Sequence, residues 1–162
     1  MRITTLATAA LAALLTVSAA QAAPKFDSGS INDVAKVMQA DGMKAEITKG
    51  KPDYIVGTTT DGVKFMAELY QCDTGRCQVT VYTAFWGPGK ATAEDMNGWN
   101  SWTFMCPAFL KEGKPFVTMG VQTAPSDDAQ AVELELKRWV GCMDSFQDFL
   151  RDPKAFLKSK GL

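Results

Sequence analysis

One apolar stripe near the C-terminal end of the chain constrains the fold more than any other feature of the sequence. Its residues recur in alternating steps of four and three, at Val132, Leu136, Trp139, Met143, Phe146 and Leu150. This spacing places all of them on one face of a helix, and the opposite face carries charges such as Glu133 and Asp144. The sequence therefore predicts a long amphipathic helix that begins near Ser126, has Asp127 and Asp128 in its first turn, and buries one side against another layer.

Two further helices are predicted from the residues at their ends. In the first, Ser30 supplies an N-cap, and Gly42 follows Met38, the last apolar residue with helical spacing. In the second, Thr92 begins the helix and Pro107 stops it. Acidic residues fill the first turn of this second helix, where the helix dipole favours negative charge.

Strand patterns lie between these helices. Four of them follow one another over residues 45–48, 54–58, 63–70 and 78–85, with Asp61-Gly62 as a hairpin turn between the second and the third. Residues 109–110 and 116–121 flank the turn-rich stretch 111–115 as a further hairpin. The order α-β-β-β-β-α-β-β-α predicts an α+β domain, in which an antiparallel sheet is flanked by helices.

The first 22 residues have the pattern of a secretory signal peptide. Arg2 supplies a positive charge, a run rich in alanine and leucine follows, and Ala20-Gln21-Ala22 forms a small-residue cleavage site. The apolar run is shorter than the roughly 20 residues that a membrane-spanning helix needs. We therefore expect cleavage after Ala22, a single soluble domain over residues 23–162, no stable membrane insertion, and a periplasmic or secreted location.

The charge of the chain argues against nucleic acid as a partner. Without residues 1–22, which contain Arg2 and no acid, 16 Lys and Arg stand against 18 Asp and Glu, a formal charge of −2. Basic residues gather only near the end, at Arg151, Lys154, Lys158 and Lys160. We interpret them as cations that favour a helix C-terminus, with a patch for an anionic surface as the alternative.

Four cysteines test the expectation of export, because cysteines pair in an oxidising compartment. Cys72 and Cys77 bracket a turn-rich quartet between two strand patterns, where opposed residues of an antiparallel pair lie close enough for a disulfide. We favour this bridge and a second from Cys106, at the end of the second predicted helix, to Cys142 in the last one. Sequence alone permits three connectivities.

A zinc site is the alternative use of these cysteines. The C-x4-C spacing lacks the C-x2-C pairs of structural zinc sites, and the chain has no His. We therefore expect neither a metal nor a cofactor.

The pairing of Cys72 with Cys77 also assigns the faces of the central hairpin. The residues that then share one face are Phe65, Ala67, Leu69, Thr80, Tyr82 and Ala84. The other face carries Met66, Glu68, Tyr70, Val79, Val81 and Thr83. Because neither face is plainly polar, the second face is either covered by the flanking helices, which we favour, or kept for a partner or a second copy of the chain.

Catalysis is not expected from this sequence. Without His, the Ser-His and Cys-His nucleophile systems are excluded, and C-x4-C in a hairpin is not the C-x-x-C of a thioredoxin-type site. The acidic pairs Glu94-Asp95 and Asp127-Asp128 remain candidates for carboxylate chemistry. Both pairs stand at predicted helix N-termini, where capping and the helix dipole already explain them.

Trp86, Asn97 and Asn100 are the candidate partner-binding residues. Asn97 and Asn100 lie one helical turn apart, and they either hold a ligand or partner or, as we favour, satisfy backbone groups of the following turn or hairpin. Trp86 stands beside Gly87-Pro88-Gly89 at a strand end, so we expect it to be the most exposed tryptophan. The other tryptophans lie on apolar faces, which favours the core over a sugar or peptide platform.

The stretch Met96-Asn97-Gly98-Trp99-Asn100, with its N-x-x-N pattern, resembles the YbjN family. The strand, acidic-Gly turn and strand of residues 109–117 add to this resemblance, as does the order of elements from Ile31 to Leu150. The cysteine-bridged hairpin is also similar to that of exported members.

Departures from the family pattern fall at Trp102, Cys106 and Pro107, where many members have basic or small residues. No role of that basic stretch is carried over to this chain. The resemblance implies a bacterial sensory transduction regulator with a fold like that of type III secretion chaperones. Such folds usually dimerise and hold other proteins, although a shared fold is only an associational argument for function.

Two functions follow from the sequence. The first is a non-catalytic exported protein that binds another protein, or a second copy of itself as a homodimer, in a regulatory or chaperone-like role. The alternative is a carrier of a small apolar ligand or envelope lipid, held between the sheet and the last helix. An open second sheet face beside Trp86 favours binding of a protein, and an internal apolar pocket behind the stripe of residues 132–150 favours the carrier.

Overall fold

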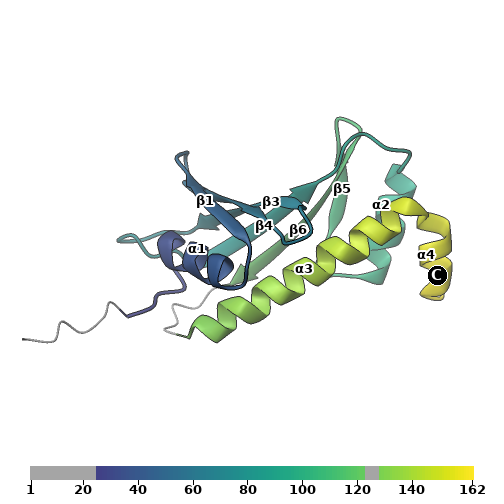
Figure 1. Ribbon diagram of the computed structural model, residues 1–162. Helices are drawn as coiled ribbons and strands as arrows, with labels where there is room; N and C mark the ends of the chain where they lie inside the picture. The colour runs from purple at the N-terminus through teal and green to yellow at the C-terminus, as the bar shows by residue number, and fades with distance from the viewer. Residues whose placement is uncertain (1–24, 123–127) are drawn as a thin grey trace, which may run out of the picture.

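The computed structural model describes residues 25–122 and 128–162 (Figure 1). Its helices are α1 (Ile31–Ala40), α2 (Ala93–Trp102), α3 (Ala129–Arg151) and α4 (Pro153–Ser159). Its strands are β1 (Lys44–Thr48), β2 (Tyr54–Thr58), β3 (Lys64–Tyr70), β4 (Val79–Phe85), β5 (Ala108–Lys111) and β6 (Lys114–Gln122). The strands form one antiparallel sheet in the order β1-β2-β3-β4-β6-β5, which confirms the predicted α+β class and element order.

Two predictions fall outside the described residues. These are the signal peptide over residues 1–22, with its cleavage site, and the helix start at Ser126 and Asp127. Within the described part, α3 begins at Ala129, and the side chain of Asp128 caps it by accepting the N–H of Gln130 at 2.9 Å.

The ends of the first two helices follow from their capping residues. Ser30 accepts the N–H of Asp33, and Gly42 past the end of α1 has φ 84°, a left-handed conformation that glycine adopts without a steric penalty. At α2, Thr92 and Asp95 form a capping box, in which each side chain accepts the other residue's backbone N–H. Asp95 is thus used in capping, as the sequence indicated for the Glu94-Asp95 pair.

The register of the central hairpin is the predicted one. Ala67 of β3 pairs with Tyr82 of β4, Leu69 pairs with Thr80, and the Cα atoms of the bridged Cys72 and Cys77 lie 3.9 Å apart. The two faces of the hairpin therefore carry the expected residues.

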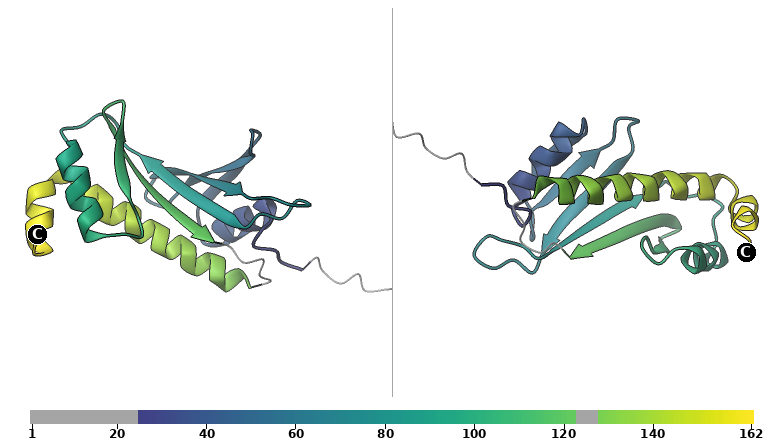
Figure 2. Two further views of the ribbon diagram at one scale, coloured as in Figure 1. Left: turned by 180° about the vertical axis from the view of Figure 1, so that it is seen from behind. Right: turned by 90° about the horizontal axis from the view of Figure 1, so that it is seen from below.

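One face of the sheet holds the core. Helices α1 and α3 both lie on this face, with α3 running across the strands (Figures 1 and 2). The stripe residues of α3 that are at most 1% exposed are Val132, Leu136, Trp139, Met143 and Phe146. The ring centroid of Trp139 lies 5.7 Å from that of Tyr82 and 6.0 Å from that of Phe65, so the stripe packs directly on β3 and β4.

The expectation that helices also cover the second face of the sheet is wrong. No helix of the described chain lies on that side (Figure 2). Burial alternates strictly along β3 and β4, so that residues on the second face are half-buried or exposed while their neighbours in sequence are buried. Tyr70 is 38% exposed and Phe85 is 53% exposed. We call this side the open face.

Two polar atoms in the core have no hydrogen-bond partner among the described residues. They are the Tyr82 hydroxyl and the Trp139 Nε1–H, and both side chains are 0% exposed. Burial, and secondarily the charge of Glu135, raises the pKa of Tyr82 well above its ordinary range, so the phenol stays protonated. A protonated, unpaired hydroxyl in the core costs stability.

Replacing Tyr82 by Phe should therefore stabilise the protein. The ring and its packing remain while an unpaired polar group is removed, so we expect the free energy of unfolding to rise by about 1 kcal/mol. Urea denaturation measures this change, with Tyr70→Phe on the open face as a control that should stay within about 0.5 kcal/mol. A less stable Tyr82→Phe variant would mean that the hydroxyl is hydrogen-bonded in solution.

Candidate functional site

The open face presents apolar side chains from most strands of the sheet. Its large apolar residues are Tyr54, Val56, Met66, Tyr70, Val79, Val81, Phe85, Phe109 and Phe116. The register sets them side by side, since Val56 pairs with Met66 and Tyr70 pairs with Val79. Charged residues such as Lys64 lie among them, so the face is largely apolar and also carries charges.

Three phenylalanines form a row across β4, β6 and β5. The ring centroid of Phe116 lies 5.3 Å from that of Phe85 and 5.2 Å from that of Phe109, and both pairs are stacked. Phe85 is 53% exposed and Phe109 is 42% exposed. A contiguous exposed aromatic patch of this kind marks an interaction surface more often than a solvated one.

Trp86 is half-buried and links the open face to the core. Its ring packs edge-on against Phe146 of α3, with centroids 5.1 Å apart. Trp86 also lines two adjoining grooves, one of about 510 Å³ that includes Tyr54, Met66 and Phe85, and one of about 270 Å³ that includes Lys90. Trp102 is also half-buried, whereas Trp99 and Trp139 are fully buried, so Trp86 belongs to the more exposed pair.

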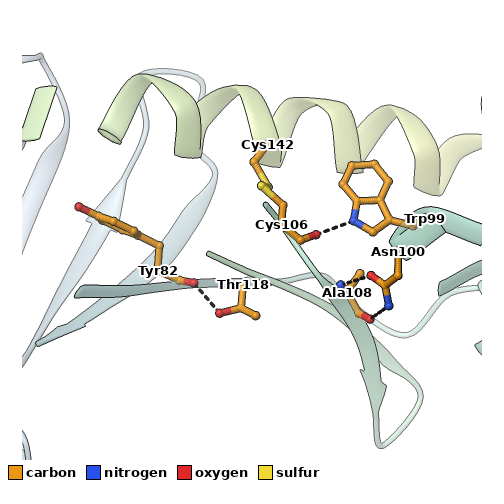
Figure 3. The surroundings of a disulfide bond; sticks show 7 residues. All are labelled: Tyr82, Trp99, Asn100, Cys106, Ala108, Thr118 and Cys142. Carbon is orange, nitrogen blue, oxygen red and sulfur yellow. Dashed lines mark hydrogen bonds between the residues drawn. A yellow bond between two sulfur atoms is a disulfide. The ribbon is translucent and has the colours of Figure 1, made fainter. Parts of the chain in front are cut away.

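The two candidate asparagines are used differently. The Asn100 side chain accepts the N–H of Ala108 at 2.7 Å and donates to the carbonyl of Ala108 at 2.9 Å (Figure 3). It therefore satisfies both backbone groups of the first residue of β5 and holds that strand against α2. Asn97 is exposed, and its backbone carbonyl accepts the Ser101 hydroxyl at 2.9 Å. Neither side chain lines the grooves beside Trp86.

Replacing Asn100 by Ala should destabilise the protein by about 1–3 kcal/mol. The change leaves the N–H and carbonyl of the buried Ala108 without their partners. The matched control is Asn97→Ala, one turn earlier on the same helix, which should alter stability by no more than about 0.5 kcal/mol. Equal effects of the two substitutions in thermal or urea unfolding would contradict the assigned role of Asn100.

The sequence predicted that the second disulfide joins two helices, and the structure corrects this. Helix α2 ends at Trp102, and Cys106 lies beyond it in the segment that leads to β5. The bridge to Cys142 spans 6.3 Å between Cα atoms and fixes this segment to α3 (Figure 3). The buried Trp99 indole N–H donates to the Cys106 carbonyl at 2.6 Å, so two independent links hold the segment in place.

Helix α4 was not predicted from the sequence. Asp152 caps it by accepting the N–H of Ala155, and Pro153 occupies its first turn, a recognisable start signal. Its Leu157 packs on α2 so closely that a Cβ on Gly98 would lie 2.5 Å from a Leu157 methyl carbon. This contact explains the glycine inside the N-x-x-N stretch.

Two of the C-terminal basic residues have contacts close by in the structure. Arg151 pairs with Asp148 at 2.9 Å, and the Lys160 amine lies 5.0 Å from the Trp102 ring centroid. Among residues 25–122 and 128–162, no group of His, Cys, Asp or Glu is arranged to hold a metal ion.

Burial raises the pKa of Asp144, with smaller contributions from the charges of Asp61 and Asp148. The carboxylates of Asp61 and Asp144 line a groove of about 290 Å³ beside α3, away from the Phe row.

Comparison with known protein families gives a match over most of the chain. Residues 30–150 match the YbjN family, which is described as "Putative bacterial sensory transduction regulator". The matched region runs from the N-cap of α1 to the last turn of α3 and so includes the whole sheet. A search of curated proteins found no match. The chain belongs to the YbjN family.

Proposed function

We propose that this protein is an exported, non-catalytic regulator that binds another protein through the open face of its sheet. The observation that carries the proposal is the Phe row, whose members Phe85 and Phe109 are 53% and 42% exposed on a face that no described helix covers. The family description as a sensory transduction regulator supports a regulatory or chaperone-like role. An exposed aromatic patch on the face of a sheet is suited to the hot spot of a protein interface.

The packing of α3 favours a protein partner over a carried lipid. A carrier needs an apolar cavity between α3 and the sheet. The stripe residues from Val132 to Phe146 are at most 1% exposed, and Trp139 among them lies in direct contact with Phe65 of β3. The hollow that includes Phe85 and Trp86 reaches Gln147 of α3, but it contains none of the stripe residues and also includes Tyr54 and Met66 of the open face. This arrangement presents apolar surface outward, where a partner can reach it.

The proposed site of action is outside the cytoplasm. Two disulfides, Cys72–Cys77 and Cys106–Cys142, suggest an oxidising compartment. The signal-peptide pattern of residues 1–22 supports the same location and a domain over residues 23–162 after cleavage. In the described part of the chain, no helix is long and apolar enough to cross a membrane.

Site-specific photo-cross-linking in the cell tests this proposal. A photoreactive phenylalanine analogue replaces Phe109 on the open face or, as a matched control, Leu134 on the solvent side of α3, which is 50% exposed. We expect a specific protein adduct from position 109 and none from position 134, with mass spectrometry identifying the partner. A purified protein that carries a bound lipid and gives no protein adduct would contradict the proposal in favour of the carrier.

A further inference from the structure

Strand β6 is longer than its neighbour β5 and has an unpaired edge. The pairing with β5 ends at Val117, which lies opposite Ala108, and one further contact joins the Thr118 N–H to the Pro107 carbonyl at 3.0 Å. Backbone groups alternate sides along a strand, so Gly120 and Gln122 direct their N–H and C=O to the same side as Thr118. In the described chain no strand lies on that side of residues 119–122. We call this stretch the β6 edge.

At each of the other two edges of the sheet, a side chain bonds to the backbone of one outward-facing residue. At β1, the Gln39 amide donates to the Ala45 carbonyl at 2.9 Å. At β5, Asn100 satisfies both backbone groups of Ala108. Proteins commonly block strand edges in this way to prevent unwanted pairing. At the β6 edge, no side chain of the described residues bonds to the backbone of Gly120 or Gln122, and both residues are exposed.

A groove of about 340 Å³ runs along the β6 edge. One wall is formed by Phe104 and Met105, which are 93% and 47% exposed, and the other by Glu135 and Arg138 of α3. The segment that carries Phe104 is anchored at Cys106, two residues later. There the Cys106–Cys142 bridge and the hydrogen bond from Trp99 link it to α3 and to α2 (Figure 3). The groove thus combines backbone groups that no described residue pairs, an apolar wall and a charged wall.

We propose that this groove binds an extended segment of the partner protein, which adds to the sheet as a strand along the β6 edge. The proposal rests on the proposed function and names how the partner is held. The backbone donors and acceptors of Gly120 and Gln122, which no described residue pairs, can bond to an extended chain, since its own backbone repeats at the same spacing. The added strand lies in line with β5, so its outward side chains extend the open face beside Phe109.

The walls define the side chains that such a segment carries. Residues that point toward the core side contact Phe104 and Met105, which fits apolar side chains at alternate positions. Toward α3 they meet the carboxylate of Glu135 and the guanidinium of Arg138, which fits a polar or charged residue at one of these positions.

A second copy of this chain is a poorer occupant than a single strand. Two-fold antiparallel pairing of β6 with β6 places the helices of both copies on the same face of the joined sheet. The groove of each copy already contains Phe104 and residues of α3. Pairing would bring the Phe104 wall and the α3 of the second copy into the same space. A single extended segment brings neither.

The test places the photoreactive phenylalanine analogue at position 104. It compares the otherwise unaltered chain with variants that differ from it only at Gly120. Gly120→Pro removes the N–H that faces the edge and no N–H directed at β4. Gly120→Ala retains the N–H, and its Cβ meets no atom within 4 Å. We expect the adduct from position 104 to fall at least tenfold in Gly120→Pro and to stay within twofold in Gly120→Ala, while the adduct from position 109 identifies the same partner.

The possible outcomes separate this inference from the proposed function. A partner captured from position 109 but not from position 104, or equally from position 104 in both Gly120 variants, overturns the strand addition and leaves the binding role intact. An adduct between two copies of the chain overturns it in favour of self-association. No protein at either position overturns both proposals.

A second measurement covers the case in which Gly120→Pro fails to fold. A synthetic peptide of the cross-linked segment, N-methylated at alternate residues, is titrated against the unaltered protein. Methylation on the edge-facing residues should weaken binding at least tenfold relative to the unmethylated peptide. Equal affinities of the two peptides would overturn strand addition.

Discussion

Replacing Cys106 and Cys142 together by Ala should lower the free energy of unfolding by about 4 kcal/mol. The bridge joins residues that are 36 positions apart, and its removal returns the entropy of that loop to the unfolded chain. The bridge also fixes the segment between α2 and β5 to α3, so its loss frees one wall of the groove along β6. Urea denaturation under non-reducing conditions measures the change.

The matched comparison is the double replacement of Cys72 and Cys77. That bridge closes a loop with a sequence separation of only 5, for which the same chain-entropy argument gives about 2 kcal/mol. An equal or larger loss from the hairpin bridge would contradict the account. An intact mass that shows four free thiols in the exported protein would remove both bridges from it.

Replacing Trp99 by Ala should destabilise the protein by about 3–5 kcal/mol. The indole is 0% exposed, and its ring centroid lies 4.9 Å from that of Phe146 and 5.3 Å from that of Phe149. Its N–H also donates to the Cys106 carbonyl, which would lose this partner. Few single changes in this chain remove so many core contacts at once.

Trp102→Ala serves as the control for Trp99→Ala. Trp102 lies three residues later on the same helix and is half-buried, with ring contacts to Trp99 and Phe156. Its replacement should therefore cost clearly less in the same denaturation experiment. If Trp102→Ala is as destabilising as Trp99→Ala, the core is centred elsewhere.

Periodic patterns predicted the parts of the fold that depend on local geometry. The stripe of α3 was readable because helical spacing of large apolar residues has few alternatives over so long a stretch. The hairpin register was predictable because a bridge between Cys72 and Cys77 sets these two residues opposite each other, which fixes how the flanking strands β3 and β4 pair. The short helix α4 was not predicted, although Asp152-Pro153 is a helix start signal.

Features that depend on contacts between distant residues could not be predicted from one sequence. The outward residues of β3 and β4 are apolar enough to be buried, and nothing local to them says whether a helix lies above. The end of α2 was placed at Pro107, whereas Thr103 already has extended backbone angles, φ −133° and ψ 135°. The unpaired β6 edge emerges only from the pairing of the whole sheet.

The affinity of the open face for its cross-linked partner tests the central claim most directly. The variant Phe85→Ser/Phe109→Ser removes the two exposed ends of the Phe row and leaves the half-buried Phe116 in place. If these rings form a hot spot worth about 2 kcal/mol or more, the variant should bind the partner about 30-fold more weakly or worse, with an unchanged unfolding midpoint. Unchanged affinity in calorimetric titration would contradict a role for the open face in binding.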